Sequence, residues 1–124
     1  MTEAWVIDDG RRTPASSGVV LEILQARISN GQLETWLTSS SDRSLAFVTN
    51  TRRAMVVLFD GECAEQHAVD PGSGGSSDGF VLSNGQDDEY ADEDTVPLEE
   101  AFRIVGHILS EGGRPPDARW ANDR

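Results

Sequence analysis

The sequence predicts an α+β domain, with a mostly antiparallel sheet of about five to seven strands and two helices packed on it. Two segments, one near each end of the chain, place apolar residues three and four positions apart, as on one face of a helix. Between them lie several short apolar or alternating segments that are typical of strands. The connections between these strands are too short for parallel crossovers, which excludes a doubly wound sheet.

The first part of the chain predicts a strand, a linker and a helix. Residues 4–7 form a short apolar run that we expect to be an edge strand, and residues 11–17 form a linker. The next apolar residues share one helical face: Val20, Ile23, Leu24 and Ile28. Asn30 and Gly31 are expected to end this helix, because both tolerate a left-handed backbone.

The middle of the chain predicts three strands, which differ in how apolar they are. Residues 33–38 alternate, which predicts a half-buried strand with Leu37 on one face and Trp36 on the other. Residues 45–49 form the next strand. Residues 54–59 are the most apolar run in the chain. We therefore expect this run to be the central strand, covered on both faces.

The second half predicts a weaker strand, a loop and a hairpin. Residues 66–69 form a short strand, and the Gly- and Ser-rich residues 70–79 predict a flexible loop. Residues 80–83 and 86–90 then flank Asn84 and Gly85, which is a strong signal for a tight hairpin turn.

The longest helix is predicted at residues 96–110. Thr95 and Pro97 favour its start. Its apolar residues form one stripe: Leu98, Ala101, Phe102, Val105, Ile108 and Leu109. Glycine and proline pairs then stop the helix. Residues 117–122 predict either a short strand or a tail that holds Trp120 against the core.

Length and composition narrow the function classes. The 124 residues suit a single domain, which we expect to span residues 1–124. No apolar run approaches the length of a membrane span. The start of the sequence lacks the basic and apolar regions of a signal peptide. Cys63 is the only cysteine, so no internal disulfide can form. Together these features predict a cytoplasmic protein.

The charge is strongly regional. The chain carries 22 acidic and 10 basic residues, a net charge of −12, and every basic residue is arginine. Thirteen acidic residues and no basic ones lie between Arg53 and Arg103. Such a field repels nucleic acid and anionic membranes and attracts basic proteins. A solvated acidic face that prevents aggregation is the alternative interpretation.

The sequence gives only weak evidence for a catalytic or a metal site. Cys63 and His67 have the residue types of a nucleophile and a base, but the neighbouring acids disfavour the thiolate, which favours a structural cysteine. One cysteine and two distant histidines, His67 and His107, make no zinc pattern. Residues 70–79 lack the ligand spacing of a phosphate or calcium loop. Carboxylates as dense as those at 87–94 lack the apolar pocket of a catalytic pair. We expect no catalytic residue, cofactor or metal site.

Five short motifs occur in a fixed order within residues 33–121. They are residues 49–58, 70–72, 79–90 and 95–101, followed by Trp120. Their order resembles the immunity protein family one of bacterial polymorphic toxin systems. The resemblance implies an antidote that binds a cognate toxin, often a nucleic-acid deaminase, and blocks its active site without catalysis or a cofactor. We expect such a protein to be a monomer when free and to bind its toxin one to one.

The acidic corner between the predicted hairpin and the last helix is the expected partner site. A deaminase of DNA or RNA must attract phosphates, so carboxylates placed in its cleft would occupy the phosphate positions. The expected partner-binding residues are Asp87, Asp88, Glu89, Tyr90, Asp92, Glu93 and Asp94. Tyr90 would serve as an aromatic anchor. Trp5 and Trp36 are candidates for further apolar anchors, with a place in the core as the alternative for each.

Two other function classes remain open. An acidic nucleic-acid mimic, or a regulator of some other basic protein, would use the same surface. A small enzyme with carboxylate chemistry would need a concave pocket that holds separated carboxylates.

Overall fold

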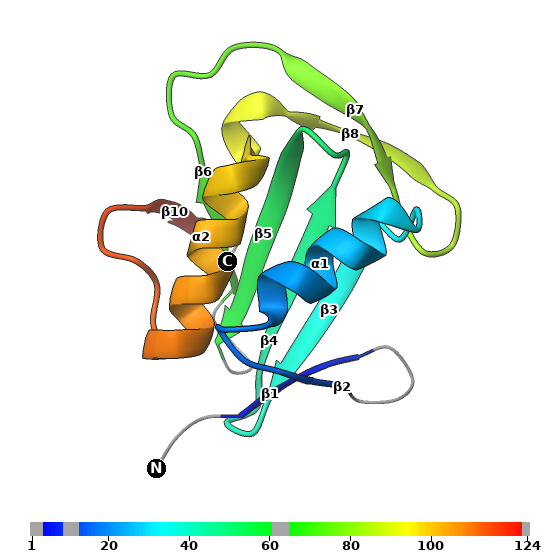
Figure 1. Cartoon of the computed structure of the whole chain (residues 1–124). Helices are drawn as coiled ribbons and strands as arrows, with labels where there is room; N and C mark the ends of the chain where they lie inside the picture. The colour runs from blue at the N-terminus through cyan, green and yellow to red at the C-terminus, as the bar shows by residue number, and fades with distance from the viewer. Residues whose placement is uncertain (1–3, 9–12, 61–64, 123–124) are drawn as a thin grey trace.

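The structure is a computed structural model that describes residues 4–8, 13–60 and 65–122. Within these residues, eight strands form one antiparallel sheet with two helices on it, which confirms the α+β prediction (Figure 1). The strands lie in the spatial order β10 (Arg119–Asn122), β6 (Glu65–Val69), β5 (Arg53–Asp60), β4 (Arg43–Thr49), β3 (Glu34–Ser39), β1 (Trp5–Ile7) and β2 (Thr13–Ala15). The short strand β9 (Val96–Pro97) pairs with the start of β5.

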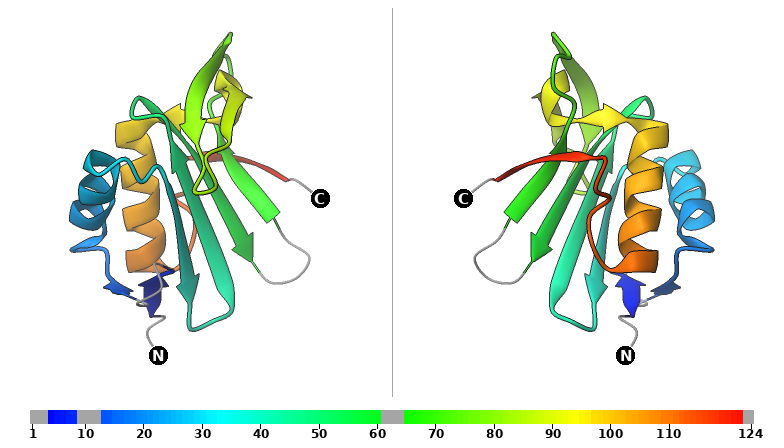
Figure 2. Two further views of the ribbon diagram at one scale, coloured as in Figure 1. Left: turned by 90° about the vertical axis from the view of Figure 1, so that its right-hand side faces the viewer. Right: turned by 90° about the vertical axis from the view of Figure 1, so that its left-hand side faces the viewer.

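Both helices lie on the same side of the sheet (Figure 2). Helix α1 (Val20–Ser29) buries Val20 and Leu24, as its apolar spacing predicts. Helix α2 (Leu98–Glu111) ends at Gly112, whose φ of 81° gives the left-handed cap that glycine adopts without strain. No helix in the described part of the chain is both long and apolar enough to cross a membrane.

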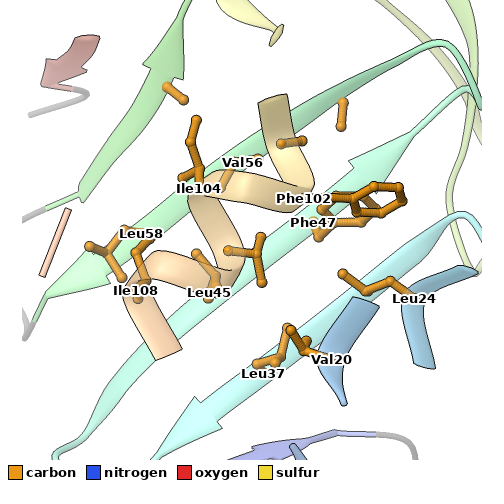
Figure 3. Close-up of a cluster of buried hydrophobic side chains, with 14 of the residues drawn as sticks. Val20, Leu24, Leu37, Leu45, Phe47, Val56, Leu58, Phe102, Ile104 and Ile108 are labelled. Atoms are coloured by element: carbon orange, nitrogen blue, oxygen red, sulfur yellow. The ribbon is translucent and has the colours of Figure 1, made fainter. Parts of the chain in front are cut away.

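The core fills the space between the helices and the sheet (Figure 3). Phe102 of α2 stacks on Phe47 of β4 with ring centroids 5.9 Å apart. Around this pair lie fully buried aliphatic side chains from both helices and from β3, β4 and β5: Val20, Leu24, Leu37, Leu45, Val56, Ile104 and Ile108. On the face of the sheet opposite the helices, side chains such as Val57 and Phe59 are only partly buried.

The central strand is β4, not β5 as expected. In β4 every residue from Leu45 to Thr49 is buried, whereas burial alternates along β5. The side chains of β5 that face away from the helices, such as Val57, are only half-buried. The apolar run at 54–59 therefore does not have two covered faces, and the expectation that it does is wrong.

Three short strands, β1, β2 and β9, differ from the predictions. The predicted edge strand at 4–7 is β1, which lies inside the sheet because β2, within the predicted linker, pairs with its outer side. Proline at position 14 suits such an edge. Helix α2 begins two residues later than predicted, because Val96 and Pro97 are extended and pair with β5 as β9. Thr95 is fully buried and does not cap the helix.

The predicted hairpin forms a separate two-stranded sheet of β7 (Ser76–Val81) and β8 (Asp87–Ala91). β7 begins four residues earlier than predicted, so part of the predicted loop at 70–79 is strand. The pairing is irregular between Ser77 and Phe80, where Gly79 has a φ of 85°. A short 3-10 helix, η1 (Asp92–Asp94), follows β8. The predicted strand at 66–69 is β6, and the terminal strand is β10.

Candidate functional site

The predicted partner-binding residues lie together in two adjoining elements. Four are on β8 and three on η1: Asp87, Asp88, Glu89, Tyr90, Asp92, Glu93 and Asp94. They follow the hairpin to the entrance of α2, where β9 joins the sheet (Figure 1). The exposed members are Asp87, Glu89 and Glu93, and the other four are partly buried. We call these seven residues the acidic edge.

The carboxylates of β8 hold the hairpin together. Asp88 accepts a hydrogen bond from the hydroxyl of Tyr90 at 2.9 Å and another from the side-chain amide of Gln86 at 2.6 Å. Asp87 accepts one from the backbone N–H of Gly79 at 3.1 Å, and Glu89 accepts one from the hydroxyl of Ser76. These bonds fix the directions of the carboxylates in the free protein.

Tyr90 is packed within the hairpin. Its ring meets Phe80 edge to face, with centroids 4.9 Å apart, and Phe80 is fully buried. Burial, and then the neighbouring Asp88 carboxylate, raise the pKa of Tyr90 to about 12. The phenol therefore stays protonated and donates its hydrogen bond over the whole physiological pH range. Its service as an aromatic anchor for a partner stays a prediction.

Arg53 ties η1 to the sheet. Its guanidinium donates to the Thr95 hydroxyl at 2.7 Å, to the Asp70 carboxylate at 2.8 Å and to the Asp92 backbone carbonyl at 3.1 Å. The Asp92 carboxylate lies 3.9 Å from Arg53 and accepts a hydrogen bond from Ser77 at 2.5 Å. The hydrogen bond from Arg53, followed by one from Ser73, lowers the pKa of Asp70. Arg53 therefore has a structural role in the acidic edge, because its contacts hold η1 in position.

The last two members of the acidic edge point toward solvent. Asp94 pairs with Nε2 of His67 at 3.0 Å, yet 46% of its side chain is exposed. Glu93 is exposed, and its backbone carbonyl accepts a hydrogen bond from the N–H of Asp70 at 2.8 Å. Both carboxylates therefore remain accessible to a partner.

An aromatic pair with one exposed member lies on the sheet face opposite the helices. Trp36 of β3 is 38% exposed, and its ring stacks on Phe59 of β5 at 5.6 Å. The two strands are separated by β4, where Ala46 lies directly opposite Trp36. The small alanine side chain leaves room for the indole to reach across β4. Of the two tryptophans considered as anchors, Trp5 is 3% exposed and belongs to the core, whereas Trp36 is accessible.

Glu34 joins this aromatic pair to the hairpin. Its carboxylate accepts a hydrogen bond from the backbone N–H of Ser83 at 2.8 Å and another from the indole N–H of Trp36 at 2.9 Å. These two bonds, that from Ser83 first, lower the pKa of Glu34. Within β7, the carbonyl of Asp78 accepts a hydrogen bond from the Asn50 side chain at 2.9 Å. Glu34 also lies within electrostatic reach of Asp88, whose charge opposes the lowering of the Glu34 pKa, so the acidic edge and the aromatic pair adjoin.

Two shallow hollows lie on either side of Asp94. One, of about 260 Å³, is lined by Met55, Val57, Glu65, His67 and Asp94. The other, also of about 260 Å³, is lined by Val69, Pro71, Glu93 and Asp94. Each combines apolar side chains with carboxylates, which suits the stem and the charged end of a long basic side chain.

A larger hollow lies elsewhere among the described residues. It has a volume of about 550 Å³ and is found where β1 and β2 meet the end of α2, with Trp5 and Leu109 in its lining. Its described lining consists of apolar residues and serines, so it offers none of the charged groups that mark the acidic edge. We therefore place the candidate site on the sheet face and not in this hollow.

The requirements of an enzyme or a metal site are met only in part. The hollow beside His67 does hold two carboxylates, Glu65 and Asp94, on an apolar floor. Residues 4–8, 13–60 and 65–122 contain no group of three or more histidines, cysteines or acidic residues that could hold a metal ion. Cys63, considered above as a nucleophile, lies outside the described residues.

The sequence was also compared with known proteins. No protein-family model matches this chain, and no curated protein is similar to it. The functional interpretation therefore depends on the acidic edge, the aromatic pair and the order of the sequence motifs.

Proposed function

We propose that this chain is an immunity protein that acts in the cytoplasm, where it binds a basic toxin domain and blocks its active site. The toxin class that fits best is a nucleic-acid deaminase, whose substrate cleft must be basic. One observation carries the proposal: the acidic edge adjoins an aromatic pair with an exposed tryptophan, because Glu34 is hydrogen-bonded to Trp36 and lies within electrostatic reach of Asp88. The order of the sequence motifs, which resembles that of immunity proteins, supports the same function.

The acidic edge has the electrostatic properties that a toxin inhibitor needs. Opposite charges on two proteins raise their rate of association by about 10- to 1,000-fold at low salt. An antidote benefits from this rate because it must capture the toxin before the toxin reaches its substrate. The carboxylates of β8 are already held by Gly79, Gln86 and Tyr90, so little side-chain freedom would be lost on binding.

Two variants with equal charge test this proposal. In the acidic-edge variant, the acidic residues are replaced by Asn or Gln, which keep an acceptor oxygen for the internal hydrogen bonds: Asp87, Asp88, Glu89, Asp92, Glu93 and Asp94. In the matched-charge variant, six exposed carboxylates outside the acidic edge are replaced in the same way: Glu22, Asp42, Asp60, Glu99, Glu111 and Asp117. Both variants change the net charge equally.

The experiment first reads the genes next to that of this chain, where the proposal expects a secreted protein with a basic C-terminal domain, and then uses that domain. The domain is produced in cells alone, with the wild-type chain, or with either variant. We expect the wild type and the matched-charge variant to copurify with the domain and restore growth, and the acidic-edge variant to protect poorly. Failure of the wild-type chain to bind the domain would contradict the proposed function. Equal protection by both variants would contradict the role of the acidic edge.

A further inference from the structure

We infer that the sheet face opposite the helices is the apolar half of the toxin interface, and that the hollow beside His67 receives an arginine side chain of the toxin. This inference rests on the proposed function and goes further, because it names the anchor and the kind of side chain that the anchor region binds. The face consists of Trp36 and Phe59 together with the floor of the hollow, Met55 and Val57.

The strand register makes these residues a continuous surface. Trp36, Ala46, Val57 and His67 lie opposite one another across β3, β4, β5 and β6. Phe59 lies opposite Ser44 and Glu65 in the adjacent row. Because side chains alternate along a strand, this surface faces away from the buried Val56 and Leu58. One uninterrupted strip thus runs from the aromatic pair to the hollow.

The aromatic pair has the properties of an interface anchor. Tryptophan is enriched among the side chains that dominate binding energy, especially beside a ring of polar groups that excludes water. Trp36 is fixed before binding, since its ring stacks on Phe59 and its N–H is bonded to Glu34. A fixed side chain loses little conformational freedom when a partner covers it.

The hollow suits arginine in both shape and charge. Its floor offers Met55 and Val57 to the aliphatic part of a side chain, and Asp94 and Glu65 line it with carboxylates. A guanidinium can donate two hydrogen bonds to one carboxylate and can stack on a flat ring, which a lysine ammonium cannot do. Asp94 is the primary acceptor, because nearly half of its side chain is exposed.

The charge of the chain selects a basic partner for this face over a second copy of the chain. A copy would bring its own net charge of −12 against the carboxylates that surround the strip. Like charges brought together at an interface disfavour association. A toxin that must attract phosphates supplies the opposite charge and carries arginines for that purpose.

The test measures the dissociation rate of the chain from the neighbouring toxin domain that the proposed function expects, purified in an inactive form. We expect Trp36→Ala to weaken binding about 30-fold or more, mainly through faster dissociation. Asp94→Asn should weaken it about tenfold and serves as a second variant, since asparagine keeps an acceptor for His67. The matched controls are Leu21→Ala, on α1 and also 38% exposed, and Glu99→Gln, on α2.

The outcomes separate this inference from the proposed function. If the wild type binds and the acidic-edge variant associates slowly, but Trp36→Ala and Asp94→Asn dissociate at the wild-type rate, the inference is wrong and the proposed function stands. If the wild type does not bind the toxin domain, both are wrong. Circular dichroism of each variant establishes that it is folded before its rates are compared.

Discussion

Individual side chains of the acidic edge combine a structural role with an exposed charge. Asp88 holds the hydroxyl of Tyr90, and Asp92 holds that of Ser77, while both keep the negative charge that a basic partner would meet. Arg53 contacts Asp92 from within, together with Asp70 and Thr95. The position of these carboxylates is therefore set by specific contacts, and each contact can be tested through the titration or the stability that it changes.

Tyr90 gives the most direct test of the packing inside the hairpin. It is the only tyrosine in the chain, so ultraviolet absorbance reports its ionisation without interference from other tyrosines. We expect a midpoint near pH 12, because burial and Asp88 both disfavour the phenolate. Asp88→Asn should lower the midpoint, while burial keeps it above the ordinary value of 10.0.

The sign of the accompanying stability change follows from the raised pKa. The contribution of Tyr90 to stability is complete below pH 10, and it is lost as the pH rises toward 12. Circular dichroism on the same samples shows whether the fold persists at the midpoint. A wild-type midpoint at 10 in the folded protein would contradict the packing of Tyr90 against Phe80 and Asp88.

Asp70→Asn tests the network around Arg53. The pKa of Asp70 is lowered in the folded protein, so its contribution to stability is present above the unfolded value of 3.8 and is lost as the pH falls below it. We expect the substitution to reduce the free energy of unfolding by about 1 kcal/mol at neutral pH, a small value because a third of the Asp70 side chain is exposed.

The pH dependence distinguishes this ion pair from a simple packing effect. In urea unfolding experiments, the difference between wild type and Asp70→Asn should shrink as the pH falls below the unfolded value of 3.8 and the folded protein also takes up the proton. Asp117→Asn is the control, because it alters an Arg–Asp pair whose Asp side chain is 71% exposed. A difference that persists unchanged at acid pH would show that the charge of Asp70 is not the cause.

The hairpin of β7 and β8 is a unit with its own small core. Phe80 is fully buried but does not belong to the main cluster between the helices and the sheet. We expect Phe80→Ala to remove hydrogen-exchange protection from β7 and β8 while β3, β4 and β5 keep theirs, because local units of a fold open separately. The loss is expected to be about 3 kcal/mol within the hairpin.

A core substitution provides the comparison. Phe102→Ala removes one ring of the stacked pair with Phe47, so it should lower protection throughout the sheet. If Phe80→Ala lowered the protection of all strands equally, the hairpin would be part of the main cooperative unit and not a separate one.

Elements with a strong local pattern could be predicted from the sequence. The helical spacing around Val20 and Leu24 and the turn at Gly85 are local signals, and α1 and the hairpin follow from them. β2 and β9 are different, because they have three and two residues and exist only through pairing with β1 and β5. No local pattern marks such strands, since the partner that holds them is distant in the sequence.

The candidate site was also predictable in part. The acidic residues are evident from composition, and the alternation in residues 33–38 placed Trp36 on the face opposite Leu37. The contact of Trp36 with Phe59 depends on the register of three strands and on the small side chain of Ala46 between them. Such a contact is set by tertiary structure, so composition and spacing did not indicate it.

The electrostatic field of the whole molecule would act on an approaching partner before any contact forms. The stretch from Arg53 to Arg103 has thirteen acidic residues, and Arg53 itself is enclosed by Thr95, Asp70 and Asp92. Arg53 is thus already paired within the fold. The acidic edge is the exposed part of this acidic region. Attraction from such a surface extends about one Debye length, roughly 8 Å at physiological ionic strength.

The most direct test is the association rate with the toxin domain, measured by stopped flow over a range of salt concentrations. We predict a steep fall of the wild-type rate with salt, a nearly unchanged slope for the matched-charge variant, and a slower rate with a flatter salt dependence for the acidic-edge variant. The difference at low salt should be about tenfold or more. Identical rates and slopes for the two variants would contradict the claim that the acidic edge is where the partner binds.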